Sequence, residues 1–509
     1  MNNEKKVVYN VLSNIVVQVL LVVSGLIIPR LILLKFGSNM NGLINSISQF
    51  LAYVGLVELG VGNAAIVILY KPIAEMDLVS ISSIISIVRK KYIFAGIIYT
   101  SVICMLAIIY PFFIRTEFDF VFVFSMVIII GLTSIIDFFI IGKYKVLLYA
   151  DSKYYIINFP KIVATIFLTI GSSILLLNNR SVFCIKVLAV ITHLGEAIFI
   201  KFYVRKQYPD INFHVIIPGK VIPQQINTLI HQLTAVITYN TDLVVLTLLG
   251  TDEKLKEISV YSVYAMAFAA INNLIGCFAT GFDSIFGNMI AQNEEIKLRK
   301  LFEIYEYCYL LILYALYTSF AVLVVPFVKC YTQGVSDVNY IRLEVGILFA
   351  ANGIVAELKN PHGCIVKAYG KYKQTQKYII AEACANIMIS IILVKPYGVT
   401  GVLIGTFISH VIADVGLIAY ADRFLLKQTS WQSVKHNVIN LGIAFFLVIT
   451  ELKIVKKIYD WKLWTIYAFV IFSINIILIG VVNALTDMKS FRDSTRIIKY
   501  KITKMLFNT

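Results

Sequence analysis

Fourteen apolar runs, each about long enough to cross a lipid bilayer, dominate this chain of 509 residues. A transmembrane helix needs roughly 20 consecutive apolar residues. Because a backbone in lipid must satisfy its own N–H and C=O groups, only helices and closed barrels cross membranes. The pattern therefore predicts an all-α polytopic membrane protein with about 14 transmembrane helices, at 8–29, 43–69, 92–114, 119–141, 155–177, 182–201, 223–249, 258–289, 302–328, 339–358, 376–394, 398–421, 434–452 and 462–484.

The composition supports this interpretation and excludes other classes of protein. Hydrophobic residues make up 59% of the chain and charged residues 15%, whereas soluble domains have about 45–50% and 25%. The net charge of +16 comes from Lys and Arg that lie between apolar runs, which favours membrane topology over nucleic-acid binding. The seven cysteines are scattered, mostly within apolar runs, so we expect no disulfide, metal or cofactor site.

The distribution of basic residues predicts the orientation of the chain. With both termini in the cytoplasm, 30 Lys and Arg lie on the inner side and 14 on the outer side, as the positive-inside rule requires. The last external loop departs from the rule because it holds four lysines. We therefore expect a multi-pass protein of the cell (cytoplasmic) membrane with both termini cytoplasmic.

An internal duplication is visible in two short segments. Residues 150–154 read A-D-S-K-Y and residues 368–372 read A-Y-G-K-Y, an offset of 218 residues that also carries the first predicted helix onto the seventh. Six helices repeated in one orientation predict two bundles related by an axis along the membrane normal, with a substrate site between them and alternating access. The expected domains are the first bundle (1–203), a cytoplasmic linker (204–222), the second bundle (223–421), and two extra helices with a basic tail (422–509).

Polar residues at membrane depth indicate the candidate site, because they are costly there unless they face protein or water. The seventh helix carries a polar stripe with Asp242 beside its end, and the first helix carries polar residues at a spacing of four. A central hydrated cavity follows, and interhelical hydrogen bonding is the alternative. The candidate cavity residues are Asn14, Gln18, Arg30, Glu58, Asn63, His231, Thr238 and Asp242.

The charged candidates allow more than one role. Glu58 is either a proton or cation site or the partner of Arg30. Arg30 either meets an anionic substrate or extends to the interface. The other intramembrane acids are interpreted as partners of neighbouring lysines or as helix-end carboxylates, namely Asp137, Glu196, Asp283, Glu357, Glu382 and Asp414. His193 and His410 are interpreted as hydrogen-bonded packing residues.

Motifs between the first two predicted helices resemble a known family. Pro29-Arg30, Gly37 and Gly42-Leu43 are followed by 56–62 (L-V-E-L-G-V-G) and 69–72 (L-Y-K-P). Together they resemble the polysaccharide flippases of the multidrug/oligosaccharidyl-lipid/polysaccharide exporter superfamily. Relatives often place several cations in the cavity, where this chain offers mostly carboxylates, amides and hydroxyls.

The resemblance implies a fourteen-helix transporter whose cavity is formed by helices 1, 2, 7 and 8. Its implied activity is to move a polyprenyl-diphosphate-linked oligosaccharide from the inner to the outer leaflet for surface polysaccharide biosynthesis. The implied partners are this substrate, membrane lipids and other polysaccharide-assembly membrane proteins. Coupling to a proton or sodium gradient stays open.

Three other classes of membrane protein fit the sequence less well. A cation-coupled multidrug or small-molecule exporter of similar fold often has an acid in its first helix, and 7–34 contains none. A major-facilitator transporter would carry a G-x-x-x-D-[RK]-x-G loop, which 71–91 lacks. A membrane glycosyltransferase or polymerase needs a substantial outer loop, and the predicted outer loops reach only about fifteen residues. We therefore expect no enzyme, and no nucleotide-binding P-loop is encoded.

Overall fold

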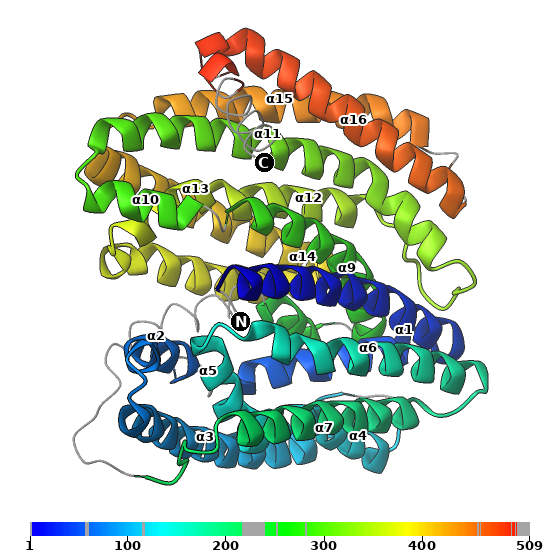
Figure 1. The fold of residues 1–509 in the computed structure, drawn as a ribbon. Coiled ribbons are helices and arrows are strands. Elements are labelled where there is room, and N and C mark those ends of the chain that lie inside the picture. The colour runs from blue at the N-terminus through cyan, green and yellow to red at the C-terminus, as the bar shows by residue number, and fades with distance from the viewer. Residues whose placement is uncertain are drawn as a thin grey trace. The chain divides into compact units, whose positions relative to one another are not determined.

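The computed structural model describes residues 3–55, 61–114, 118–215, 240–250, 253–279, 282–455, 458, 460–489, 491–493 and 495. These residues form helices and no strands (Figure 1), which confirms the all-α prediction. Among them, ten helices are long and apolar enough to cross a membrane. The described residues of the fourteen predicted spans are helical except at a few span ends, chiefly residues 339–342. Residues 56–60 of the second span, 223–239 of the seventh and 280–281 of the eighth lie outside the described residues.

Helix α1 (Asn3–Val54) contains two of the predicted spans. A straight helix of 52 residues would be about 78 Å long, more than twice the roughly 30 Å of a bilayer's hydrocarbon core. The chain leaves helical geometry at Gly37, with φ 76° and ψ −177°. Glycine tolerates positive φ because it has no Cβ, so this residue lets the first span lead into the second.

The structure divides into two compact units, with the boundary after Ser259. The first unit begins with α1. Two of its other helices start after residues that favour helix N-termini. Asp77 and Ser181 cap α3 and α7 through side-chain oxygens, as Asp and Ser commonly do. These helices are α2 (Val61–Ala74), α3 (Leu78–Phe113), α4 (Phe120–Ile136), the π-helix η2 (Asp137–Ile141), α5 (Gly142–Ala150), α6 (Tyr154–Leu177), α7 (Val182–Gln207), the short helix Asn240–Leu249 and the start of α9 (Lys254–Ala279). The predicted domain limits at 203, 222 and 421 stay predictions.

The second unit is built around α11 (Glu295–Tyr331), which is largely buried. It packs against α12, α15 and α16. The other elements of this unit are the rest of α9, α10 (Phe282–Ala291), α12 (Leu343–Leu358), α13 (Asn360–Ala368), α14 (Tyr372–Tyr420), the π-helix η3 (Ala421–Leu426), α15 (Trp431–Val455) and α16 (Trp461–Thr486). Helix α14 also joins two predicted spans, with positive φ at Gly398.

The last two helices are firmly attached to this unit. Figure 1 shows α15 and α16 beside α11. Trp464 Nε1 donates to the carbonyl of Leu323 at 3.1 Å, and Asn475 Nδ2 donates to Ser319 Oγ at 3.0 Å. Val322, Val455 and Ile471 add an apolar core. These bonds and contacts make α15 and α16 an integral part of the second unit.

Helices α11 and α12 approach closely at one glycine. A Cβ built on Gly353 would lie 2.0 Å from the Tyr317 ring, and Tyr317 is fully buried. Small residues permit this kind of close helix contact in membranes.

We predict that Gly353→Ala destabilises the protein by about 1–3 kcal/mol, because the added methyl must displace a buried ring. Gly363→Ala is the matched control, since a Cβ there meets nothing within 4 Å, and it should be neutral or slightly stabilising. Thermal unfolding of the purified variants measures both. Equal midpoints for the two variants would contradict the close approach.

Candidate functional site

The structure places the eight predicted cavity residues in different surroundings. Asn14 and Arg30 are partly buried on α1, and Gln18 is exposed. Asp242 is buried at 4% exposure. Glu58, His231, Thr238 and the side chain of Asn63 lie outside the described residues. Of the eight, Asp242 is the one that the structure brings into a described polar cluster.

A row of hydrogen bonds joins the second half of α1 to α3, the helix Asn240–Leu249 and the start of α9. Asn41 Nδ2 donates to Ser259 Oγ at 2.8 Å. The hydroxyls of Ser46 and Thr247 are 2.6 Å apart. We call this row the polar seam; its members are Asn41, Ser46, Tyr53, Tyr110, Thr241, Thr247 and Ser259.

The remaining bonds of the seam come from two tyrosines. Tyr110 OH donates to Ser46 Oγ at 2.7 Å, and the hydroxyls of Tyr53 and Thr241 are 2.7 Å apart. Asp242, next in the chain, acts electrostatically on the Tyr53 hydroxyl. Apart from Tyr53, the seam residues are buried. Their polar groups are thus hydrogen-bonded to one another and shielded from solvent.

The sequence explains why α1 fits so closely here. Ser46 and Tyr53 are seven residues apart, so they share one face of the helix. On the same face, a Cβ at Gly42 would lie 1.9 Å from the carbonyl oxygen of Leu255. The absent side chain lets the backbone of α9 approach α1, and the hydroxyl and amide groups replace lost hydration.

Asn41 and Ser259 are 218 positions apart, which is the offset of the repeated A-x-[SG]-K-Y motif. The duplication and its axis stay predictions.

A second polar group in the first unit is a cluster of charged residues at η2. Asp137 accepts from Lys145 Nζ at 2.8 Å and lies 3.3 Å from His193 Nε2. His193 Nδ1 lies 3.3 Å from Glu196 Oε2. The sequence predicted a neighbouring lysine or a helix-end position for both acids; Asp137 has its lysine in Lys145, whereas the partner of Glu196 is His193. A π-helix often occurs near a functional site.

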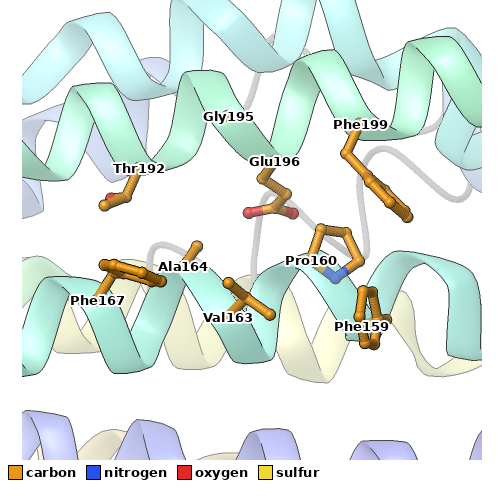
Figure 2. Close-up of a pocket in the computed structure, with 9 residues that line it drawn as sticks. All are labelled: Phe159, Pro160, Val163, Ala164, Phe167, Thr192, Gly195, Glu196 and Phe199. Atoms are coloured by element: carbon orange, nitrogen blue, oxygen red, sulfur yellow. The ribbon is translucent and has the colours of Figure 1, made fainter.

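Glu196 also reaches into a pocket of about 300 Å³ between α6 and α7. Figure 2 shows its carboxylate extending from α7 toward α6, opposite Pro160. Phe159 and Phe167 line this pocket and are 56% and 66% exposed, as expected for side chains that meet lipid. The pocket contains none of the eight predicted residues, and its lining suits an apolar chain better than a glycan.

No known protein-family profile matches the sequence, and no curated protein matches it. The structure, by contrast, is similar to solved transporters. The lipid II flippase MurJ in an inward closed conformation is 14% identical, with a TM-score of 0.64 over 94% of this chain and 100% of that one. An inward-facing multidrug resistance MATE family transporter of the MOP superfamily is 11% identical, with a TM-score of 0.61 over 80% and 96%.

A third similar structure is a MOP superfamily transporter from Pyrococcus furiosus, described as having a binding pocket of reverse polarity. It is 11% identical, with a TM-score of 0.55 over 84% of this chain and 98% of that one. At these identities the likeness concerns the fold. The chain therefore has the fold of these polytopic transporters, and the sequence resemblance is confirmed at that level.

Sequence reasoning missed most of the polar seam. Ser, Thr and Tyr are common inside membrane bundles, so Ser46, Tyr53 and Tyr110 carry no distinctive pattern. One usable signal was present: the duplication offset relates Asn41 to Ser259. Their contact required the tertiary structure.

We predict that Asn41→Cys with Ser259→Cys, in a chain lacking its seven native cysteines, forms an efficient cross-link. The bonded atoms are 2.8 Å apart, within reach of a short thiol cross-linker. A protease site inserted in 204–222 would separate the halves on a reducing gel, and the cross-link would keep them joined. Ser48→Cys with Ser259→Cys is the control, because Ser48 is exposed. Equal cross-linking of both pairs would contradict the seam.

Proposed function

We propose that this protein is a membrane transporter that moves a polyprenyl-diphosphate-linked oligosaccharide across the cytoplasmic membrane for surface polysaccharide biosynthesis. It does so by alternating access between two bundles, with no covalent chemistry. The observation that carries the proposal is the fold likeness to a lipid II flippase over 94% of this chain. The MATE transporter covers 80%, so the flippase accounts for more of the chain.

The polar seam supports the proposal physically. A substrate with a large polar glycan needs hydrogen-bonding groups at membrane depth, and the seam offers hydroxyls and an amide. A transporter must also close one side while it opens the other. The seam's hydrogen bonds are individually modest, so they can be exchanged for bonds to substrate or water.

Arg30 is the residue we propose for the diphosphate. It is partly buried on α1, directly after Pro29, and a guanidinium binds phosphate oxygens in a bidentate manner. With the predicted topology, it lies near the outer end of the first span. It would therefore hold the diphosphate late in translocation.

A cation-coupled small-molecule exporter is the second candidate function. The observation that favours it is the TM-score of 0.61 to a MATE transporter, close to the 0.64 of the flippase. Asp242, buried at 4% exposure, supplies a carboxylate such an exporter would use. The lack of acids in 7–34 argues for the lipid-linked substrate.

Reconstitution in liposomes distinguishes the two functions. The leaflet position of a polyprenyl-diphosphate oligosaccharide is followed by its accessibility to a membrane-impermeant glycan-modifying reagent. Protein-dependent appearance of the glycan on the far leaflet supports the flippase. Movement of cationic drugs under an ion gradient, with no movement of the glycan, would assign the exporter function instead.

We predict that Asp242→Asn lowers the translocation rate at least about tenfold, since hydrogen bonds to charged groups contribute about 1.5–3 kcal/mol. Asp210→Asn is the control, because Asp210 is exposed in the described structure, and it should keep the wild-type rate. Arg30→Ala and Glu58→Gln should reduce the rate in the same assay. Wild-type rates in all three site variants, at equal amounts of protein, would refute the assignment.

A further inference from the structure

The second unit contains a buried cluster of charged residues where α12 ends against α14. Lys359 Nζ donates to Glu382 Oε1, and His410 Nδ1 lies 2.6 Å from the same oxygen. Lys359 Nζ is 4.0 Å from Asp414 Oδ1, beyond hydrogen-bond range. Lys359 and His410 thus both bind Glu382.

Asp414 is the residue that this arrangement leaves unsatisfied. It is 5% exposed, and neither of its carboxylate oxygens has a hydrogen-bond partner among the described residues. Another acid, Glu357, acts electrostatically on Asp414, and its own Oε2 accepts from Tyr309 OH and Asn360 Nδ2. The other titratable groups facing Asp414 are Lys359, Glu382, His410 and Tyr314.

The charges of the cluster do not balance. Three carboxylates share a single lysine, and His410 is bonded to the acid that the lysine already neutralises. An isolated buried carboxylate is very costly, so such a group takes up a proton instead.

The first unit provides an internal comparison. The duplication offset of 218 residues carries Glu196 onto Asp414 and His193 to within one residue of His410. In the first unit, Asp137 binds Lys145, and His193 bridges Asp137 and Glu196. Two acids there have two basic partners, and every carboxylate is paired. The two repeats thus carry related clusters, and the one in the second unit has surplus acid.

We propose that Asp414 is a proton-binding site, with Lys359, Glu382 and His410 as its positioning residues. Proton uptake forms an O–H bond on the Asp414 carboxylate and leaves it neutral. Proton release restores the anion, which Lys359 can then approach by leaving Glu382. Lys359, with a side chain 20% exposed, is the least buried member and connects the cluster to the surface. The proposal that this proton drives transport rests on the proposed function. The proposal that Asp414 binds a proton is independent of it.

Infrared spectroscopy of the purified protein tests the site without any substrate. A protonated carboxyl has a C=O band distinct from that of a carboxylate. We expect this band at neutral pH in the wild type, and its loss in Asp414→Asn. Glu196→Gln, the equivalent position in the first unit, should keep the band. A wild-type spectrum in Asp414→Asn, or loss of the band in Glu196→Gln, would overturn the proposal.

A second variant keeps the test decisive if Asp414→Asn does not fold. Glu382→Gln leaves Asp414 in place and removes the acid that holds Lys359. Lys359 then becomes available to Asp414, so we expect Asp414 to ionise and the band to disappear. Persistence of the band in a folded Glu382→Gln protein would contradict the proposed arrangement. Loss of the wild-type band on adding NaCl at constant pH would show a bound cation and overturn the proton assignment.

Transport measurements separate this inference from the proposed function. In liposomes, a pH gradient should change the wild-type translocation rate by about fivefold or more, and Asp414→Asn should show no response. If the band is present but no lipid-linked glycan moves, the proposed function fails and the proton site stands. If the glycan moves but Asp414→Asn keeps the band and the gradient response, the proton site fails alone.

Discussion

The constraint on which this structure depends is that polar groups at membrane depth must be satisfied within the protein. Each backbone solves this by forming helices, and each polar side chain solves it by finding a partner on another helix. The polar seam, the cluster at Asp137 and the attachment of α16 by Asn475 all follow this rule. A few buried polar atoms of the described residues depart from it, and Asp414 is the acid among them that lacks a hydrogen-bond partner on both carboxylate oxygens. That departure has the most direct functional meaning.

Close packing and polar bonding act together in the first unit. Gly42 admits the backbone of α9, and the resulting short distance lets Asn41 and Ser259 bond. The seam is therefore close-packed because of a missing side chain, and its bonds are hydroxyl and amide bonds. That these bonds open during transport, and that the Asp414 cluster drives it, belongs to the proposed function.

The predicted offset of 218 residues relates the two charged clusters, and their pairings differ. His193 and Glu196 stand on α7 three residues apart, and His410 and Asp414 stand on α14 four residues apart. The first pair is balanced by Lys145 and Asp137. In the second, Lys359 and His410 both bind Glu382, so the corresponding acid is left over. A change in partner geometry between repeats thus turns a structural pair into a candidate proton site.

The sequence by itself determined the all-α membrane architecture and nearly every helix, because about 20 apolar residues in lipid can only form a spanning helix. It also predicted a neighbouring lysine or a helix-end position for Asp137, and Lys145 is that lysine. The sequence could not distinguish Asp414 from paired acids such as Asp137. It gives no distances from Lys359 to Glu357, Glu382 or Asp414. Which acid binds Lys359 depends on how α12 and α14 cross. In the same way, the contact of Asn41 with Ser259 depends on how α1 and α9 cross. Only the tertiary structure decided these pairings, because side-chain distances between helices far apart in the chain are set by packing and not by local sequence.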